Sequence, residues 1–148
     1  MSESNMVQAT TEQADNSPRS PGHGIRLLVC GGRYFANPTF LWRSLDEIDA
    51  TRGRISCVIE GASDDVTGPY VGADYWAHQW ALARDRPYER HHAEWKIHGT
   101  AAGPIRNRNM RDKGKPDLVV SFPGDKGTRG MIEIARAGSI QVLELRPR

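Results

Sequence analysis

The chain of 148 residues is poor in cysteine, and no cysteine or histidine stands at the spacing of a metal site. Cys30 and Cys57 are its only cysteines, and both fall in apolar runs. We therefore expect two buried, reduced thiols and no bound metal. No apolar run approaches 18 residues, and no charged-then-apolar leader is found, so no membrane contact is expected. These absences predict a cytoplasmic protein.

Strong charge is also lacking, because the net charge is only +2 and no lysine-rich block or basic helix occurs. Such a balance suits a small anionic ligand and argues against nucleic acid as a partner. The first 24 residues contain almost no large apolar side chains, so burial cannot offset the entropy of ordering them. We predict a flexible arm over 1–24 and one domain over 25–148.

What the domain does contain is an alternation of strand-like apolar runs with segments of helical spacing. The expected strands are 25–30, 55–60, 88–95, 117–122 and 140–145, with helices from about 38, 73, 103 and 127, and a loop over 62–71. This order predicts an α/β, three-layer Rossmann-like domain with helices on both faces of a mainly parallel five-stranded sheet. Its expected strand order is 3-2-1-4-5.

In that strand order the first and fourth strands are neighbours, and the winding direction reverses between them. Ligands bind at this switch point, beyond the carboxyl ends of the strands. A glycine-bearing turn follows each of the two strands, Gly31-Gly32-Arg33 after the first and Pro123-Gly124-Asp125-Lys126-Gly127-Thr128 after the fourth. We expect the two turns to meet.

The second turn joins a strand directly to a helix, where exposed backbone N–H groups and the helix dipole favour an anion. Pro123, Gly124, Gly127 and Thr128 form the predicted phosphate cradle, and Thr128 can cap the helix or bond a phosphate oxygen. The Gly-Lys-Ser/Thr order of a P-loop is absent. The competing interpretation is a capped turn with no ligand.

The first turn lacks the third glycine of the dinucleotide fingerprint, and by itself Gly31-Gly32 could be a plain tight bend. Arg33 adds a planar cation that can hold a phosphate, although an arginine there can also be merely solvated.

Two further stretches supply candidates for the same site. Gly61 ends the second strand, and Gly72 and Ala73 open the next helix with Asp74, which could bond ribose hydroxyls or simply favour the helix dipole. Arg106 and Asn107 share a helix that carries few large apolar residues. They could therefore face a ligand, or belong to a solvated surface helix.

No catalytic constellation can be assigned. The histidines are not tied to a nucleophile-bearing turn, so no Ser-His-Asp or Cys-His arrangement is predicted. Asp74, Asp125 and Glu133 are the acid/base candidates, although Glu133 lies more than one turn inside its helix. Asp74 is the candidate we retain.

As a set, these motifs resemble the YspA-like branch of the SLOG superfamily. The matching pieces are Val29-Cys-Gly-Gly-Arg33, Gly72-Ala-Asp74 with Ala77, Glu94-Trp95, Ala102-Gly-Pro-Ile-Arg-Asn107 with Met110, and Phe122-Pro-Gly124 with Gly127-Thr128. The resemblance implies a Rossmann-like domain related to the LOG phosphoribohydrolases and to the Rossmann core of DprA. Because this branch is frequent in phages and mobile elements, the resemblance also implies a location in the host cytoplasm if a phage encodes the protein. It further implies a nucleotide-derived ligand and, by analogy with related enzymes, a homodimer or higher homo-oligomer.

The chain departs from the LOG enzymes at the residues that carry catalysis. Their phosphate turn reads Pro-Gly-Gly-x-Gly-Thr, with a catalytic glutamate shortly after the threonine and an arginine from a preceding helix. Asp125 replaces the second glycine here, and Arg129, Gly130 and Met131 stand where those enzymes place their glutamates. The resemblance therefore carries over the phosphate cradle and Arg106, but not the hydrolytic glutamate.

The leading hypothesis is a sensor or sequestering protein that holds a nucleotide-derived phosphate compound, such as an ADP-ribose-like or NAD-like molecule or a nucleoside monophosphate. Arg33, Arg106 and Thr128 would contact the anion, and no cofactor is required. The alternative is an N-glycosidic hydrolase that uses Asp74 or another carboxylate. A single-strand nucleic acid binder of DprA type ranks last, because no basic groove with interleaved aromatics is seen.

Overall fold

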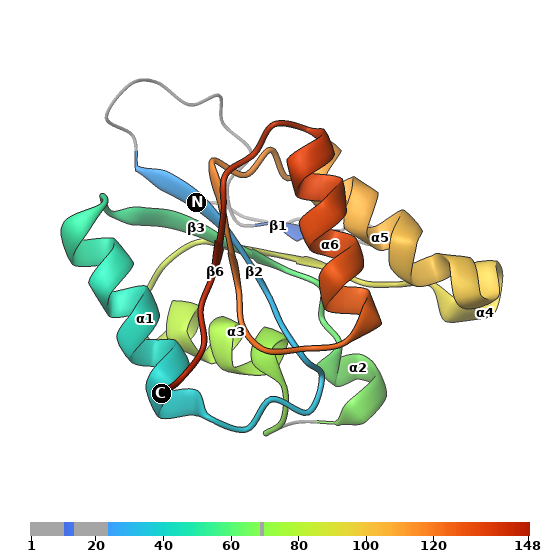
Figure 1. The fold of residues 1–148 in the computed structure, drawn as a ribbon. Helices are drawn as coiled ribbons and strands as arrows, with labels where there is room; N and C mark the ends of the chain where they lie inside the picture. Colours follow the sequence, from blue (N-terminus) through green and yellow to red (C-terminus); the bar gives the residue numbers. More distant parts are fainter. Residues whose placement is uncertain (1–10, 14–23, 69) are drawn as a thin grey trace.

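A six-stranded sheet forms the centre of the molecule in the computed structural model, which describes residues 11–13, 24–68 and 70–148 (Figure 1). The strand order is β1-β4-β3-β2-β5-β6. Their bounds are β1 Thr11–Gln13, β2 Ile25–Cys30, β3 Ile55–Glu60, β4 Tyr88–His91, β5 Leu118–Ser121 and β6 Val142–Glu144. From β2 onward the five strands are parallel and follow the order 3-2-1-4-5, which confirms the predicted fold class.

The strand added to the five that were predicted, β1, lies in the predicted N-terminal arm. β1 pairs antiparallel with the edge strand β4, with Thr11 opposite His91 and Gln13 opposite Glu89. The sequence did not indicate this strand, because three polar residues carry no periodic apolar signal. Residues 1–10 and 14–23 of the arm lie outside the described residues, and the division into arm and domain stays a prediction.

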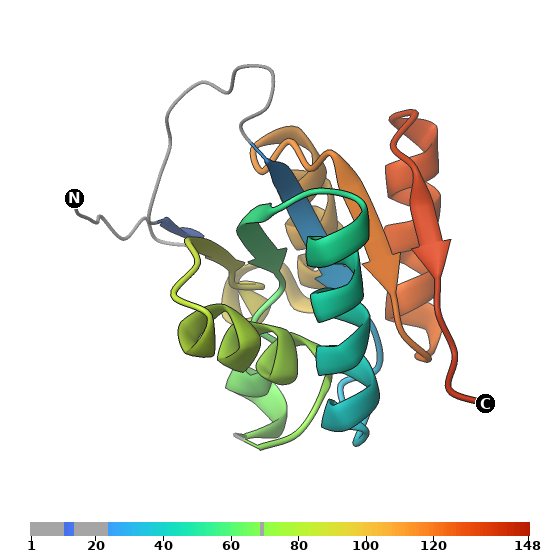
Figure 2. The same ribbon diagram turned by 90° about the vertical axis from the view of Figure 1, so that its left-hand side faces the viewer.

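Helices cover both faces of the sheet, with α1 and α3 on one face and α5 and α6 on the other (Figures 1 and 2). Their bounds are α1 Pro38–Thr51, α2 Asp64–Thr67, α3 Ala73–Ala83, α4 Trp95–His98, α5 Ala102–Asp112 and α6 Lys126–Ala137, with a 3₁₀ turn at Gly99–Ala101. No helix among the described residues is long and apolar enough to cross a membrane.

Side chains of β2 alternate between the two cores, as a strand that is buried on both faces requires. Leu27 and Val29 pack with α1 and α3, whereas Leu28 and Cys30 pack with Met110 of α5 and Met131 of α6. The continuous apolar character of this strand is thus explained by helices on both sides.

The start of α1 follows the predicted signal. Asn37 caps α1, and its side chain accepts a hydrogen bond from Phe40 N at 3.1 Å. Both cysteines are buried, as expected.

The loop predicted over 62–71 was wrong in part, because it contains the short helix α2. Asp64 and Asp65 lie in its first turn, where their negative charges interact favourably with the helix dipole. Each also contacts a side chain in or directly after β4. Contacts with the β4 region therefore support α2, which is too short for its sequence to show helical periodicity.

Candidate functional site

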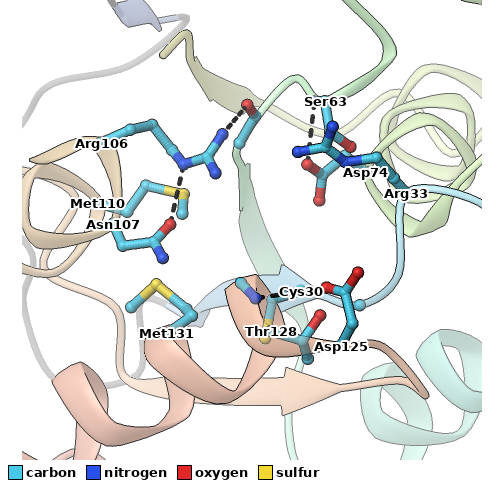
Figure 3. A pocket seen from close by; sticks show the side chains of 13 residues that line it. Cys30, Arg33, Ser63, Asp74, Arg106, Asn107, Met110, Asp125, Thr128 and Met131 are labelled. Carbon is cyan, nitrogen blue, oxygen red and sulfur yellow. Dashed lines mark hydrogen bonds between the residues drawn. The ribbon is translucent and has the colours of Figure 1, made fainter. Parts of the chain in front are cut away.

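A cavity of about 440 Å³ opens at the carboxyl ends of β2, β3 and β5 (Figure 3). Side chains reach it from the loops after β2 and β3 and from α3, α5 and α6. This is the switch point of the sheet, where the ligand was expected. Eight of the predicted ligand-binding residues line the cavity: Gly31, Arg33, Gly61, Asp74, Arg106, Asn107, Gly127 and Thr128.

The two glycine turns meet, as the strand order requires. Gly32 N donates a hydrogen bond of 2.9 Å to Pro123 O. A Cβ on Gly31 would lie 2.7 Å from Ala73 Cβ, and one on Gly124 would lie 2.7 Å from Gly32 N. The missing side chains therefore let the turns and the start of α3 pack against one another.

The other five predicted residues, Gly32, Gly72, Ala73, Pro123 and Gly124, do not line this cavity. Gly72 N bonds Phe35 O at 3.1 Å, and Ala73 N bonds Gly32 O at 3.0 Å. Pro123 and Gly124 instead line a separate depression between α6 and the end of β6. In the described structure these residues form the frame that positions the cavity wall.

The N-terminus of α6 points into the cavity through Gly127 and Thr128. Its N-cap is Asp125, whose Oδ1 accepts a hydrogen bond from Gly127 N at 3.3 Å. Thr128 is buried, whereas Asp125 is exposed. An incoming anion would therefore meet a helix terminus that is already capped by a long, exposed hydrogen bond, which ligand contacts can replace.

Arg106 of α5 is held rigidly at the cavity wall. Its Nη1 donates to Gly61 O at 2.6 Å and its Nε to Asn107 Oδ1 at 2.9 Å (Figure 3). Burial lowers the pKa of Arg106, Asp74 opposes that shift, and the nearby charge of Arg33 adds to it. The two guanidinium groups thus act on the same small volume. An anion between them would relieve their mutual repulsion.

Asp74 lies in the first turn of α3 and is buried at the cavity wall. Its Oδ2 accepts a hydrogen bond from Ser63 N at 3.0 Å. Burial raises the pKa of Asp74, and the charge of Arg106 works against that increase. Of the other two acid/base candidates, Asp125 lines the cavity, while Glu133 is exposed on α6 and does not.

The most prominent group that the sequence did not single out is Glu60, the last residue of β3. Its side chain is fully buried, accepts a hydrogen bond from Ala62 N at 2.6 Å and pairs with Arg90 of β4. Burial raises the pKa of Glu60 to about 8, although the Arg90 guanidinium opposes the shift. In the sequence, the signal that could have identified Glu60 is a carboxylate at the end of a mostly apolar strand.

The floor of the cavity is apolar and carries sulfur. Cys30, Met110 and Met131 line it, and burial raises the pKa of the Cys30 thiol to about 12, which keeps the thiol protonated and inert. No group of three or more potential metal ligands occurs in the part of the chain that the structure describes.

Comparison with known proteins agrees with this architecture. The model of the YspA, cpYpsA-related SLOG family (YAcAr) matches residues 25–98, from β2 to the end of α4. The gene 61 protein of Mycobacterium phage D29 is 32% identical over 126 residues, which cover 80% of this chain and 94% of that protein. No solved structure gives a significant match.

Proposed function

Because the chain belongs to the YspA- and cpYpsA-related SLOG family, we propose that its cavity binds the phosphate of a nucleotide-derived ligand, and that the protein acts as a sensor or sequestering protein. The family implies a ligand of this general class. The observation that carries the proposal is the convergence of Arg33, Arg106 and the N-terminus of α6 on one cavity.

The anion would lie between the two arginines and the first turn of α6. Arg106 needs no rearrangement to receive it, since Gly61 O and Asn107 Oδ1 already set the plane of its guanidinium. A group ordered before binding loses little conformational entropy when the ligand arrives, which favours affinity. Thr128 and the Gly127 N–H supply the neutral donors of the same anion site.

The residues of α6 at and beside the cavity favour binding over hydrolysis. Met131 lines the cavity in the region where the LOG enzymes carry a glutamate, and a thioether cannot act as an acid or base. Gly130, the neighbouring residue, has no side chain. We therefore rank a sensor or sequestering role above turnover.

One observation keeps an N-glycosidic hydrolase as the second candidate. Asp74 is a buried carboxyl in the cavity, and its pKa is raised by burial, as is common for catalytic acids and bases. In that role Asp74 would stabilise the positive charge that develops on the ribose as the glycosidic bond breaks.

The proposal is tested by thermal unfolding of the full chain with AMP, NAD and ADP-ribose, combined with chromatography for released base. We expect at least one compound to raise the melting temperature without release of base. Arg106→Ala should weaken that binding about tenfold or more, because it removes a charged hydrogen-bonding partner. Arg108→Ala is the matched control, since Arg108 is exposed on the same helix and does not line the cavity.

Three outcomes would count against parts of the proposal. If no compound shifts the melting temperature of the wild-type chain, nucleotide binding is wrong. An equal shift in the Arg106→Ala variant removes Arg106 from the site. Base release that Asp74→Asn abolishes would establish the hydrolase instead.

A further inference from the structure

Beside the cavity lies a narrow recess that the sequence did not predict, and its enclosed part has room for about one water molecule. It shares Arg33, Gly61, Ser63 and Arg106 with the cavity, so the two spaces adjoin across the pair of arginines. Beyond the shared residues, its lining is formed by α2, the stretch after β4 and the start of α4: Ala62, Asp65, Val66, Ala93 and Trp95.

Trp95 gives this recess an exposed aromatic surface. It is the first residue of α4, and its side chain remains 38% exposed. One edge of the indole is seated on α5, because a Cβ added to Gly103 would lie 3.5 Å from Trp95 Cη2. Val66 of α2 is 52% exposed in the same recess. Apolar surface kept in solvent beside a polar cavity is typical of a ligand-binding surface.

Both spaces carry charges of both signs. The cavity is lined by Asp74 and Asp125 as well as by the two arginines and the α6 N-terminus. The recess shares the arginines and adds Asp65, which hydrogen-bonds His92 Nδ1 beside the apolar surface of Trp95. A carboxylate beside an apolar surface disfavours a second anionic group and accepts hydrogen bonds from N–H donors. The recess thus suits a neutral, planar group that bears such donors.

We infer that the heterocyclic base of the ligand stacks on the exposed face of Trp95 at the mouth of the recess, while the phosphate lies between Arg33 and Arg106. This inference rests on the proposed function and adds to it the position of the base and a specificity-determining residue. Stacking on an aromatic side chain tolerates different bases, so Asp65 and the shape of the recess would provide the discrimination between them.

The test compares binding of AMP, NAD and ADP-ribose with binding of ribose 5-phosphate, which carries the phosphate but no base. Calorimetric titration of the full chain gives each affinity. Trp95→Ala should weaken the nucleotide that binds best by about tenfold or more and leave ribose 5-phosphate within about twofold. Ile97→Ala is the control, since Ile97 is an exposed apolar residue of α4 that does not line the recess.

The results separate this inference from the proposed function. If Arg106→Ala weakens every ligand and Trp95→Ala weakens none, the phosphate site stands and the base lies elsewhere. Equal weakening of nucleotide and ribose 5-phosphate by Trp95→Ala would also overturn the inference, because it would indicate a disturbed fold near α4. If the wild-type chain binds none of the four compounds, the proposed function and the inference both fail.

Discussion

The packing of the site depends on the absence of a Cβ atom at Gly124. A Cβ on this residue would lie 2.1 Å from Thr128 Oγ1 and 2.7 Å from both Thr128 Cβ and Gly32 N. These neighbours belong to the first turn of α6 and to the facing turn, and neither can move without disturbing the cavity wall. The glycine of the phosphate turn is thus required for packing, whether or not it contacts a ligand.

We expect Gly124→Ala to lower the free energy of unfolding by about 1–3 kcal/mol, the usual cost of forcing an extra carbon into a packed place. Gly130→Ala, in the middle of α6, should raise it by about 0.5–1 kcal/mol, because nothing lies within 4 Å of the added carbon and alanine favours a helix. Urea denaturation of both variants measures the difference. Equal stabilities would contradict the packing role of Gly124.

At the level of elements, the segment around α2 is the part of the site that the sequence described least well. Ala62 and Tyr70 adopt positive φ of 54° and 72°, which is uncommon for residues with a side chain. The helix is held to the β4 region by an ion pair between Asp64 and Arg90 and by a hydrogen bond between Asp65 and His92. This segment contributes Ser63 to the cavity and Val66 to the recess, so its attachment to β4 shapes both.

Asp64→Asn should loosen this attachment, since it removes one charge of a largely buried pair and leaves Arg90 with Glu60 as its remaining acidic partner. We expect amide hydrogen exchange across 62–71 to quicken by about tenfold, with α1 and β2 unchanged. Asp112→Asn is the control, because its pair with Arg111 is exposed. Protection that stays the same in both variants would show that the ion pair does not restrain α2.

For the whole molecule, the buried carboxyl of Glu60 couples stability to pH. Its pKa rises from an ordinary 4.5 to about 8 in the folded chain, so folding favours the neutral form. The contribution of Glu60 is therefore fully favourable below about pH 4.5 and is lost as the pH rises through about 8. Burial raises the pKa of Asp74 as well, which acts in the same direction.

Glu60→Gln, which keeps the shape and removes the titration, should make the fall in stability between pH 5 and pH 8 shallower than in the wild-type chain. Denaturant titrations at several pH values measure the two slopes. Glu133→Gln is the matched control, since Glu133 is exposed on α6. The three proteins differ only at residues 60 and 133, so the difference between slopes reports Glu60. Parallel slopes for wild type and Glu60→Gln would contradict the assignment.

Much of this architecture could be predicted because it is local. Apolar runs such as 25–30 and the helical spacing after Asn37 report burial residue by residue, and parallel order follows from the alternation of elements. From that order it followed that the turns at Gly31 and Gly124 would lie together. The strand order also brought Arg33 to this edge of the sheet, whereas Asp74 and Arg106 were predicted only as candidates for the same site, each with a structural alternative.

The fold, the edge of the sheet that forms the cavity and the meeting of the glycine turns there all follow from the sequence alone. The folded structure was needed to show which predicted residues line the cavity, that Glu60 pairs with Arg90, and where the recess at Trp95 lies. These features depend on residues that are far apart along the chain. Glu60 and Arg90 are 30 residues apart, and no periodicity records which distant side chains come into contact.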